Sequence, residues 1–196
     1  MHAQGIPADK ALTLLKAGNY SYVATGESSG NISPAQRLHT AEEGQHPYAV
    51  VITCSDSRVV PEVVFSAGIG DLFVIRVAGN VIDSHQLGSI EYAAEHLGCR
   101  LVLVLGHTHC GAVDAAIAGN SEGYIKYIVE EIQEAIGQEK DPYEACHHNV
   151  RHSMHVIENS LKIQAVEHDY GVKVMGAIYD IETGKVDFLQ DNLRQF

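Results

Sequence analysis

The sequence predicts an α/β fold: a mostly parallel central β-sheet flanked by helices, with a C-terminal β-hairpin and an N-terminal helical arm. Three short apolar runs rich in β-branched residues, 48–54, 72–78 and 101–107, are bounded by Gly, Pro or charged residues. Continuous runs of this kind are typical of strands covered on both faces, as in a parallel sheet. A helical segment separates the second run from the third, and strand–helix–strand is the crossover unit of such sheets.

The chain begins with a predicted helix over residues 8–25, where Ala11, Leu14 and Leu15 share one face. A Gly/Ser-rich link, "TGESSGNISP", follows it and leads toward the first strand. We expect one domain over residues 1–196, in which residues 1–30 form the helical arm, because 196 residues suit a single domain with a real core.

The crossover segment "SHQLGSIEYAAEHLG" carries apolar residues at helical spacing and ends in Gly98, a suitable C-cap. Helical patterns also cover residues 121–137 and 142–168. In the tail, "VKVMGAIYDIETGKVDFL", two strand-like runs flank a Thr-Gly pair, which predicts a hairpin.

Composition narrows the class of protein. The chain has 13 basic and 25 acidic residues and a net charge of −12, so a nucleic acid or an anionic membrane is not an expected partner. No apolar run approaches the roughly 20 residues of a membrane span, and the N-terminal stretch lacks the pattern of a signal peptide. We therefore expect a cytoplasmic protein, in which the 4 cysteines are thiols or metal ligands rather than a disulfide framework.

Two polar motifs directly follow predicted strands. "CSDSR" begins at Cys54, and "GHTHCG" contains His107 and Cys110. The carboxyl ends of parallel strands meet at one edge of a sheet, so these three side chains can converge. Two thiolates and an imidazole suit zinc, and three protein ligands leave the fourth position open, which is the catalytic arrangement. Asp56 and Arg58 follow Cys54 closely enough to contact such a site.

Each motif alone also fits a simpler structure. "CSDSR" could be a turn with a buried thiol, and "GHTHCG" a glycine-rich turn. Their position on two strand ends of one α/β unit favours the catalytic metal site.

The paired motifs resemble the zinc signature of the β-class carbonic anhydrases, and the similarity continues through "GDLFVIRVAGN", "GSIEYAAEHLG" and "GAIYDIETGKV". The resemblance implies a zinc lyase that reversibly hydrates carbon dioxide to bicarbonate and a proton. It implies one Zn²⁺ per chain on Cys54, His107 and Cys110, with water as the fourth ligand. In this family Asp56 would accept the hydrogen bond of that water, and Arg58 would pair with Asp56.

The resemblance also assigns a substrate pocket. Gln45, Phe73 and Tyr92 match family positions that line the carbon dioxide site, partly from the neighbouring subunit, so at least a homodimer is implied, and a tetramer is open. Ala78 and Gly111 match positions beside the metal, although some relatives have valine in place of Ala78. A subgroup that closes the zinc with the Asp is marked by a Trp where this chain has a valine, so an open site is expected.

Alternatives remain at this level. The same site could hydrolyse carbonyl sulfide or carbon disulfide, or the chain could be a non-catalytic, zinc-stabilised assembly protein. The presence of both Asp56 and Arg58 speaks against the assembly protein, because a structural metal needs no oriented fourth ligand. His148, His152 and His155 share one helix face, which more readily forms a solvated or interface surface than a second metal site.

Overall fold

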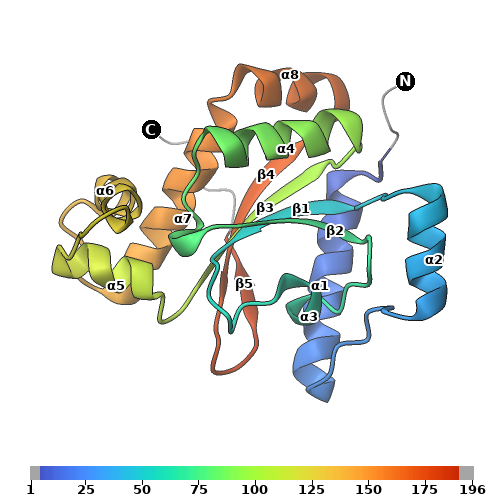
Figure 1. The fold of residues 1–196 in the computed structure, drawn as a ribbon, viewed down its shortest axis with the longest axis horizontal. Coiled ribbons are helices and arrows are strands. Elements are labelled where there is room, and N and C mark those ends of the chain that lie inside the picture. Colours follow the sequence, from blue (N-terminus) through green and yellow to red (C-terminus); the bar gives the residue numbers. More distant parts are fainter. Residues whose placement is uncertain (1–4, 190–196) are drawn as a thin grey trace.

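A computed structural model describes residues 5–189, which form a five-stranded sheet with helices on both faces (Figure 1). The strands are β1 (Ala49–Thr53), β2 (Leu72–Arg76), β3 (Leu101–His107), β4 (Lys173–Tyr179) and β5 (Val186–Phe188). Their spatial order is β2-β1-β3-β4-β5; all neighbours are parallel except β4 and β5, which form the antiparallel C-terminal pair. The predicted fold class is confirmed, including the hairpin.

The helical elements are α1 (Ala8–Thr25), α2 (Pro34–Glu43), α3 (Pro61–Val64), the short 3₁₀ turn η1 (Ala78–Asn80), α4 (Ser84–His96), α5 (Gly111–Ala118), α6 (Ile125–Ile136), α7 (Pro142–Glu158) and α8 (Leu161–Tyr170). The predicted helix at 8–25 is confirmed by α1, and α4 confirms the crossover helix. Gly98 lies just beyond α4 with a φ of 75°. Periodicity missed α2, α3 and α5, because they are short or only weakly apolar on one side.

The single helix predicted over 142–168 is wrong, since two helices occupy this stretch. The first ends at Glu158 with Asn159 as its C-cap, and Ser160 caps the second: its hydroxyl accepts hydrogen bonds from the backbone N–H groups of Lys162 and Ile163. Such a cap satisfies N–H groups that a new helix leaves without a partner. α6 likewise begins at Ile125, four residues after the start of the helix predicted over 121–137.

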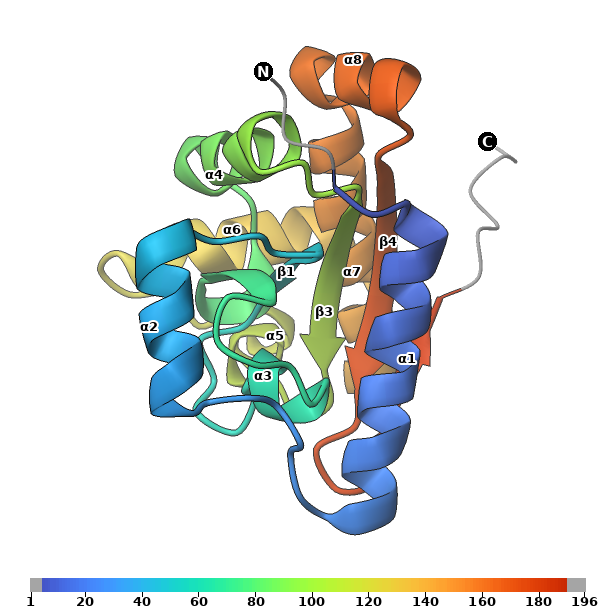
Figure 2. The ribbon, with the colours of Figure 1, turned by 90° about the vertical axis from the view of Figure 1, so that its right-hand side faces the viewer.

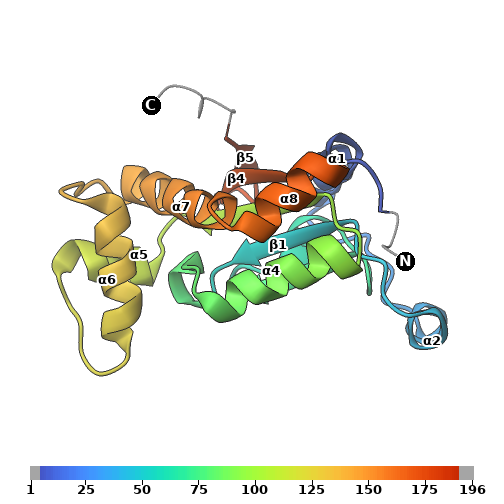
Figure 3. The ribbon, with the colours of Figure 1, turned by 90° about the horizontal axis from the view of Figure 1, so that it is seen from above.

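Alternate residues of β1 and β3 point to opposite faces of the sheet and build two apolar layers. Val50 and Ile52 pack with buried residues of α4 and α7, whereas Ala49 and Val51 pack with α1. Figure 2 shows α1 running along its face, and Figure 3 shows α4, α7 and α8 on the other. The expectation that all three apolar runs are covered on both faces is wrong for β2, an edge strand whose residues are half-buried or exposed.

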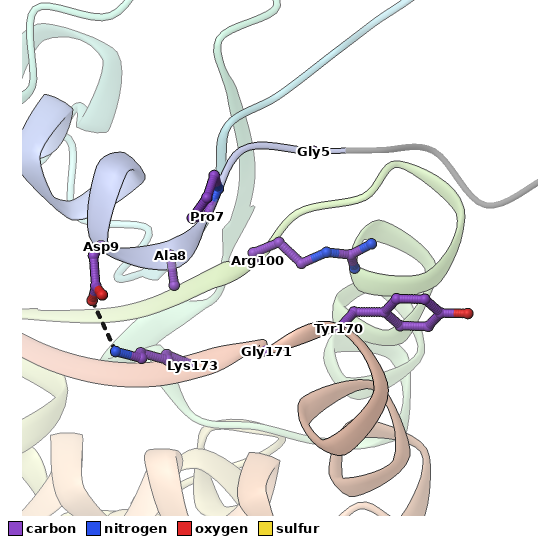
Figure 4. A pocket seen from close by; sticks show the side chains of 8 residues that line it. All are labelled: Gly5, Pro7, Ala8, Asp9, Arg100, Tyr170, Gly171 and Lys173. Carbon is purple, nitrogen blue, oxygen red and sulfur yellow. Dashed lines mark hydrogen bonds and ion pairs between the residues drawn. The ribbon is translucent and has the colours of Figure 1, made fainter.

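The amino edge of the sheet is tied to α1 and α8 by charged groups (Figure 4). Lys173 Nζ lies 2.8 Å from Asp9 Oδ1, and the Arg100 guanidinium lies 4.7 Å from the centre of the Tyr170 ring. These four residues line a hollow of about 370 Å³ together with Gly5, Pro7, Ala8 and Gly171. None of the residues predicted for the metal site lines this hollow. Cys54 and His107 lie instead at the opposite, carboxyl edge of the sheet, where β1 and β3 end.

No helix within residues 5–189 is long and apolar enough to cross a membrane.

Asn19 links α1 to distant segments through a buried side-chain amide. Its Nδ2 donates to the carbonyl oxygens of Val64 (3.1 Å) and Gly184 (2.8 Å), and its Oδ1 accepts from the N–H of Val186 (3.0 Å). We predict that Asn19→Ala lowers the free energy of unfolding by about 1–3 kcal/mol, because buried backbone groups lose their partners. Urea denaturation measures this loss; an unchanged midpoint would show that these bonds contribute nothing.

Candidate metal centre

The register of β1 and β3 places the two motifs beside each other. Thr53 pairs with Leu105, so the chain leaves β1 at Cys54 just as β3 approaches its end at His107. From these neighbouring strand ends the chain continues toward β2 on one side and β4 on the other. This is the switch point of an open α/β sheet, where such proteins place their binding sites.

The predicted metal ligands converge. The sulfur atoms of Cys54 and Cys110 and a ring nitrogen of His107 all lie within 4.8 Å of one another. The three residues are buried, with exposed fractions of 5%, 3% and 1%. Cys110 stands at the N-cap of α5, but its side chain makes no capping hydrogen bond and can face the other two residues. Among residues 5–189 no second group of this kind is found.

His107 is oriented as a metal ligand. Its Nδ1 lies 2.8 Å from the carbonyl oxygen of Thr108, and because a carbonyl only accepts, Nδ1 must carry the proton. Nε2 therefore holds a lone pair. It is buried and finds no hydrogen-bond partner in the described part of the chain. A buried acceptor beside two thiols, on a ring fixed by its other nitrogen, fits a cation such as Zn²⁺.

The thiols share one proton in the absence of a cation. A hydrogen bond from Cys110 is the main cause that lowers the pKa of Cys54 to about 4, and the backbone N–H groups of Gly79 and Asp56 act in the same direction. The same hydrogen bond and burial raise the pKa of Cys110. One sulfur is thus already a thiolate at neutral pH, and a bound divalent cation would displace the remaining proton.

Asp56 and Arg58 form the expected pair, in bidentate geometry. Arg58 Nε donates to Asp56 Oδ1 (2.9 Å) and Nη2 donates to Oδ2 (2.7 Å). Arg58 Nη2 also donates to the carbonyl oxygen of His109, which joins this pair to the second motif. The hydrogen bonds from Arg58 hold the pKa of the Asp56 carboxyl well below its usual range, so Asp56 is ionised at neutral and mildly acidic pH.

Sequence reasoning missed Arg76. This residue ends β2, and its guanidinium donates to the carbonyl oxygens of Cys54 (3.1 Å) and Asp56 (2.6 Å). The loop of the first motif is therefore held from the neighbouring strand. Its signal was available: a lone Arg at the carboxyl end of an apolar run, on the edge where the motifs lie.

The predicted pocket residues fall into two groups. We call Cys54, His107 and Cys110 the metal group. Ala78 and Gly111 adjoin it, next to Gly79 and Cys110 respectively. Phe73 pairs with Val50, four residues before Cys54, and so lies about 13 Å along the strand from the site. Tyr92 packs on Phe73 with ring centres 6.3 Å apart.

Gln45 is exposed and lies before β1 begins. Within one chain, Gln45, Phe73 and Tyr92 are therefore not gathered around the metal group.

The histidine face of α7 forms no metal group within the described residues. His152 Nε2 instead lies 3.2 Å from Glu131 Oε1 on α6, and His155 is exposed.

Comparison with known proteins identifies the family. Residues 49–186 match the family described as carbonic anhydrase. A carbonic anhydrase of Mycolicibacterium smegmatis is 36% identical over 188 residues, which cover 88% of this chain and 89% of that protein. Carbonic anhydrase 2 of Mycobacterium tuberculosis is 45% identical over 127 residues, which cover 62% of this chain and 61% of that protein.

Solved structures agree with these relatives. The β-carbonic anhydrase CafA of Aspergillus fumigatus superimposes with a TM-score of 0.75 at 26% identity, over 93% of this chain and 90% of that one. The Coccomyxa β-carbonic anhydrase, solved in complex with acetazolamide, superimposes with a TM-score of 0.70 at 26% identity, over 80% of this chain and 78% of that one. The shared sequence and fold place this chain in the β-class carbonic anhydrase family.

Proposed function

We propose that this protein is a zinc enzyme that catalyses the reversible hydration of carbon dioxide to bicarbonate and a proton. One observation carries the proposal: a buried Cys54–His107–Cys110 group lies beside a carboxylate that a bidentate arginine fixes. A purely structural metal site has no use for that carboxylate. Membership of the carbonic anhydrase family supports the same reaction.

Cys54, His107 and Cys110 would hold one zinc ion per chain. When bound by three protein ligands, zinc acidifies water and makes it nucleophilic near neutral pH. The three residues supply two negative sulfurs and a neutral imidazole, so the site is electrically balanced once occupied. We expect it to acidify water less strongly than a site with three neutral imidazoles.

Asp56 and Arg58 orient the reacting water. The ionised Asp56 can accept a hydrogen bond from that water, which leaves a lone pair directed toward carbon dioxide. Arg58 prevents the carboxylate from rotating, since both of its oxygens are engaged. The Asp56 carboxylate accepts hydrogen bonds from both the backbone N–H and the side chain of Arg58. Hydrogen bonds to an ionised carboxylate are short and strong, so they hold it in one orientation.

We also propose that the active form is a homo-oligomer, at least a dimer, in which a second chain supplies Gln45, Phe73 and Tyr92 to the pocket. The edge strand β2 carries Phe73 and is open to a neighbour. α2 stands away from the sheet with no buried residue (Figure 3) and exposes 60% of Leu38. The four cysteines are free, and we propose a cytoplasmic location, in which such thiols stay reduced.

The ligand set is tested by metal content. We predict about one zinc per purified chain, and Cys54→Ala, His107→Ala and Cys110→Ala should each lose most of it. Cys99→Ala is the matched control, because Cys99 is also a buried thiol but donates to the carbonyl oxygen of Pro47, away from the group. Elemental analysis of the four variants measures their zinc content. If one of the three ligand variants keeps its full zinc, the substituted residue is not a ligand.

Catalysis is tested by stopped-flow measurement of carbon dioxide hydration on zinc-loaded protein. Asp56→Asn and Arg58→Ala should each lower the rate by about 10- to 100-fold while zinc content stays normal. The amide of the first variant can donate where an acceptor is needed, and the second leaves the carboxylate without its partner. Lys162→Ala, which removes an ion pair with Glu95 far from the site, is the control.

If the unmodified protein is zinc-loaded but inactive toward carbon dioxide, the proposed reaction is wrong. If Asp56→Asn and Arg58→Ala lose zinc while the remaining loaded molecules keep the full rate, the pair is structural.

A further inference from the structure

Helix α7 buries three polar side chains beside the metal centre. Cys146, Asn149 and Ser153 lie at helical spacing along one side and have exposed fractions of 4%, 1% and 2%. We call these three residues the α7 polar face. Each donates a hydrogen bond to a backbone carbonyl: Cys146 to His107 (3.2 Å), Asn149 to Gly79 (2.7 Å) and Ser153 to Asn80 (3.0 Å).

These carbonyls belong to the two segments that surround Cys54. His107 is itself one member of the metal group, and Gly79 donates its N–H to the Cys54 sulfur at 3.2 Å. The α7 polar face therefore holds the backbone around the metal group through buried hydrogen bonds. Burying polar groups is costly unless they are hydrogen-bonded, and an apolar helix face would cover the sheet at less cost.

The Gly79 segment needs to be held. Gly79 has a φ of 70° and Asn80 has a φ of 49°. Both lie in the left-handed region of backbone conformation, which residues other than Gly adopt only rarely. A Cβ on Gly79 would lie 2.7 Å from Ile132 Cδ1 and 3.1 Å from Ala112 Cβ, so the backbone is also closely packed. Asn149 Oδ1 and Asn80 Nδ2 are buried and have no hydrogen-bond partner among the described residues. Leaving these polar atoms unpaired destabilises the fold further.

Gly79 thus links Asn149 to the Cys54 sulfur. Its carbonyl receives the Asn149 amide, and its N–H points at the thiol. If the carbonyl loses its donor, the two peptide units of Gly79 can rotate, and the N–H···S hydrogen bond weakens. A hydrogen bond to a thiolate withdraws electron density from sulfur and so tunes the bond that the sulfur makes to a metal.

We propose that Asn149 is a positioning residue of the metal centre, which acts through Gly79 on the donor strength and orientation of Cys54. The inference rests on the proposed function only in that Cys54 must bind the metal. It assigns a role to a helix that carries no ligand, and Ser153 supports the same segment through Asn80.

The test uses the full-length protein with Co²⁺ in place of zinc, together with the release of zinc to a chromophoric chelator. Asn149→Ala should move the thiolate-to-cobalt charge-transfer band to lower energy, because an unbonded thiolate is the better electron donor. The same variant should release zinc about 10- to 100-fold faster than the unmodified protein, the range expected when a partner of a metal ligand is lost.

Asn19→Ala is the matched control. Asn19 is also a buried asparagine on a helix whose amide donates to backbone carbonyls, but its partners are Val64 and Gly184 rather than the metal segments. This variant should lose stability while its cobalt spectrum and zinc release stay unchanged. If Asn149→Ala loses stability in the same way with an unchanged spectrum and unchanged release, the residue is merely structural and the inference is wrong.

Ser153→Ala decides the matter if Asn149→Ala does not fold. It removes only the hydroxyl that donates to Asn80, and a smaller shift in the same direction would support the inference, whereas no change would overturn it. An unmodified protein that binds neither cobalt nor zinc would overturn the proposed function as well, so the two failures are distinguishable.

Discussion

The parallel pairing of β1 with β3 is the constraint on which the rest of the site depends. It sets Thr53 beside Leu105 and thereby brings Cys54 next to the end of β3, where His107 and Cys110 follow. A slip of one residue would turn every side chain of one strand to the other face and separate the thiol from the imidazole. The register is secured because both faces are buried: Val50 and Ile52 need one apolar layer and Val51 the other.

The charge states of Cys54 and Asp56 also prepare the site for a cation. Bringing two thiols and an imidazole into a buried space is unfavourable for charged forms, yet hydrogen bonds from Cys110, Gly79 and Asp56 lower the pKa of Cys54 to about 4. Nearby, the Arg58 guanidinium keeps Asp56 ionised. The site therefore holds negative charge and a buried nitrogen lone pair before any cation arrives, which is a state that a divalent metal relieves.

Much of this arrangement could be predicted from the sequence. The apolar runs identified β1, β2 and β3, and the carboxyl-edge rule joined Cys54 to His107 and Cys110, which the distances confirm. Apolar periodicity predicted helix boundaries less reliably where a single residue ends one helix or begins the next. The cap at Ser160 splits a continuous helical pattern into two helices, and periodicity cannot register such a break.

Other features depend on contacts that no local pattern encodes. The exposure of β2 follows from its place at the edge of the sheet, which is a property of strand order. Arg76 and Asn149 act through backbone carbonyls of segments distant in the chain, so their partners become visible only after folding. Phe73 and Tyr92 lie away from the metal group in one chain, and their proposed role requires a second chain.

The central claim is that these two strand ends create one metal site with three protein ligands and an open fourth position. X-ray absorption at the zinc edge of the purified protein tests it most directly. The account predicts two sulfur atoms at about 2.3 Å, one imidazole nitrogen at about 2.0–2.1 Å and one further light atom at a similar distance. A shell of three or four sulfurs, or one without imidazole scattering, would contradict it.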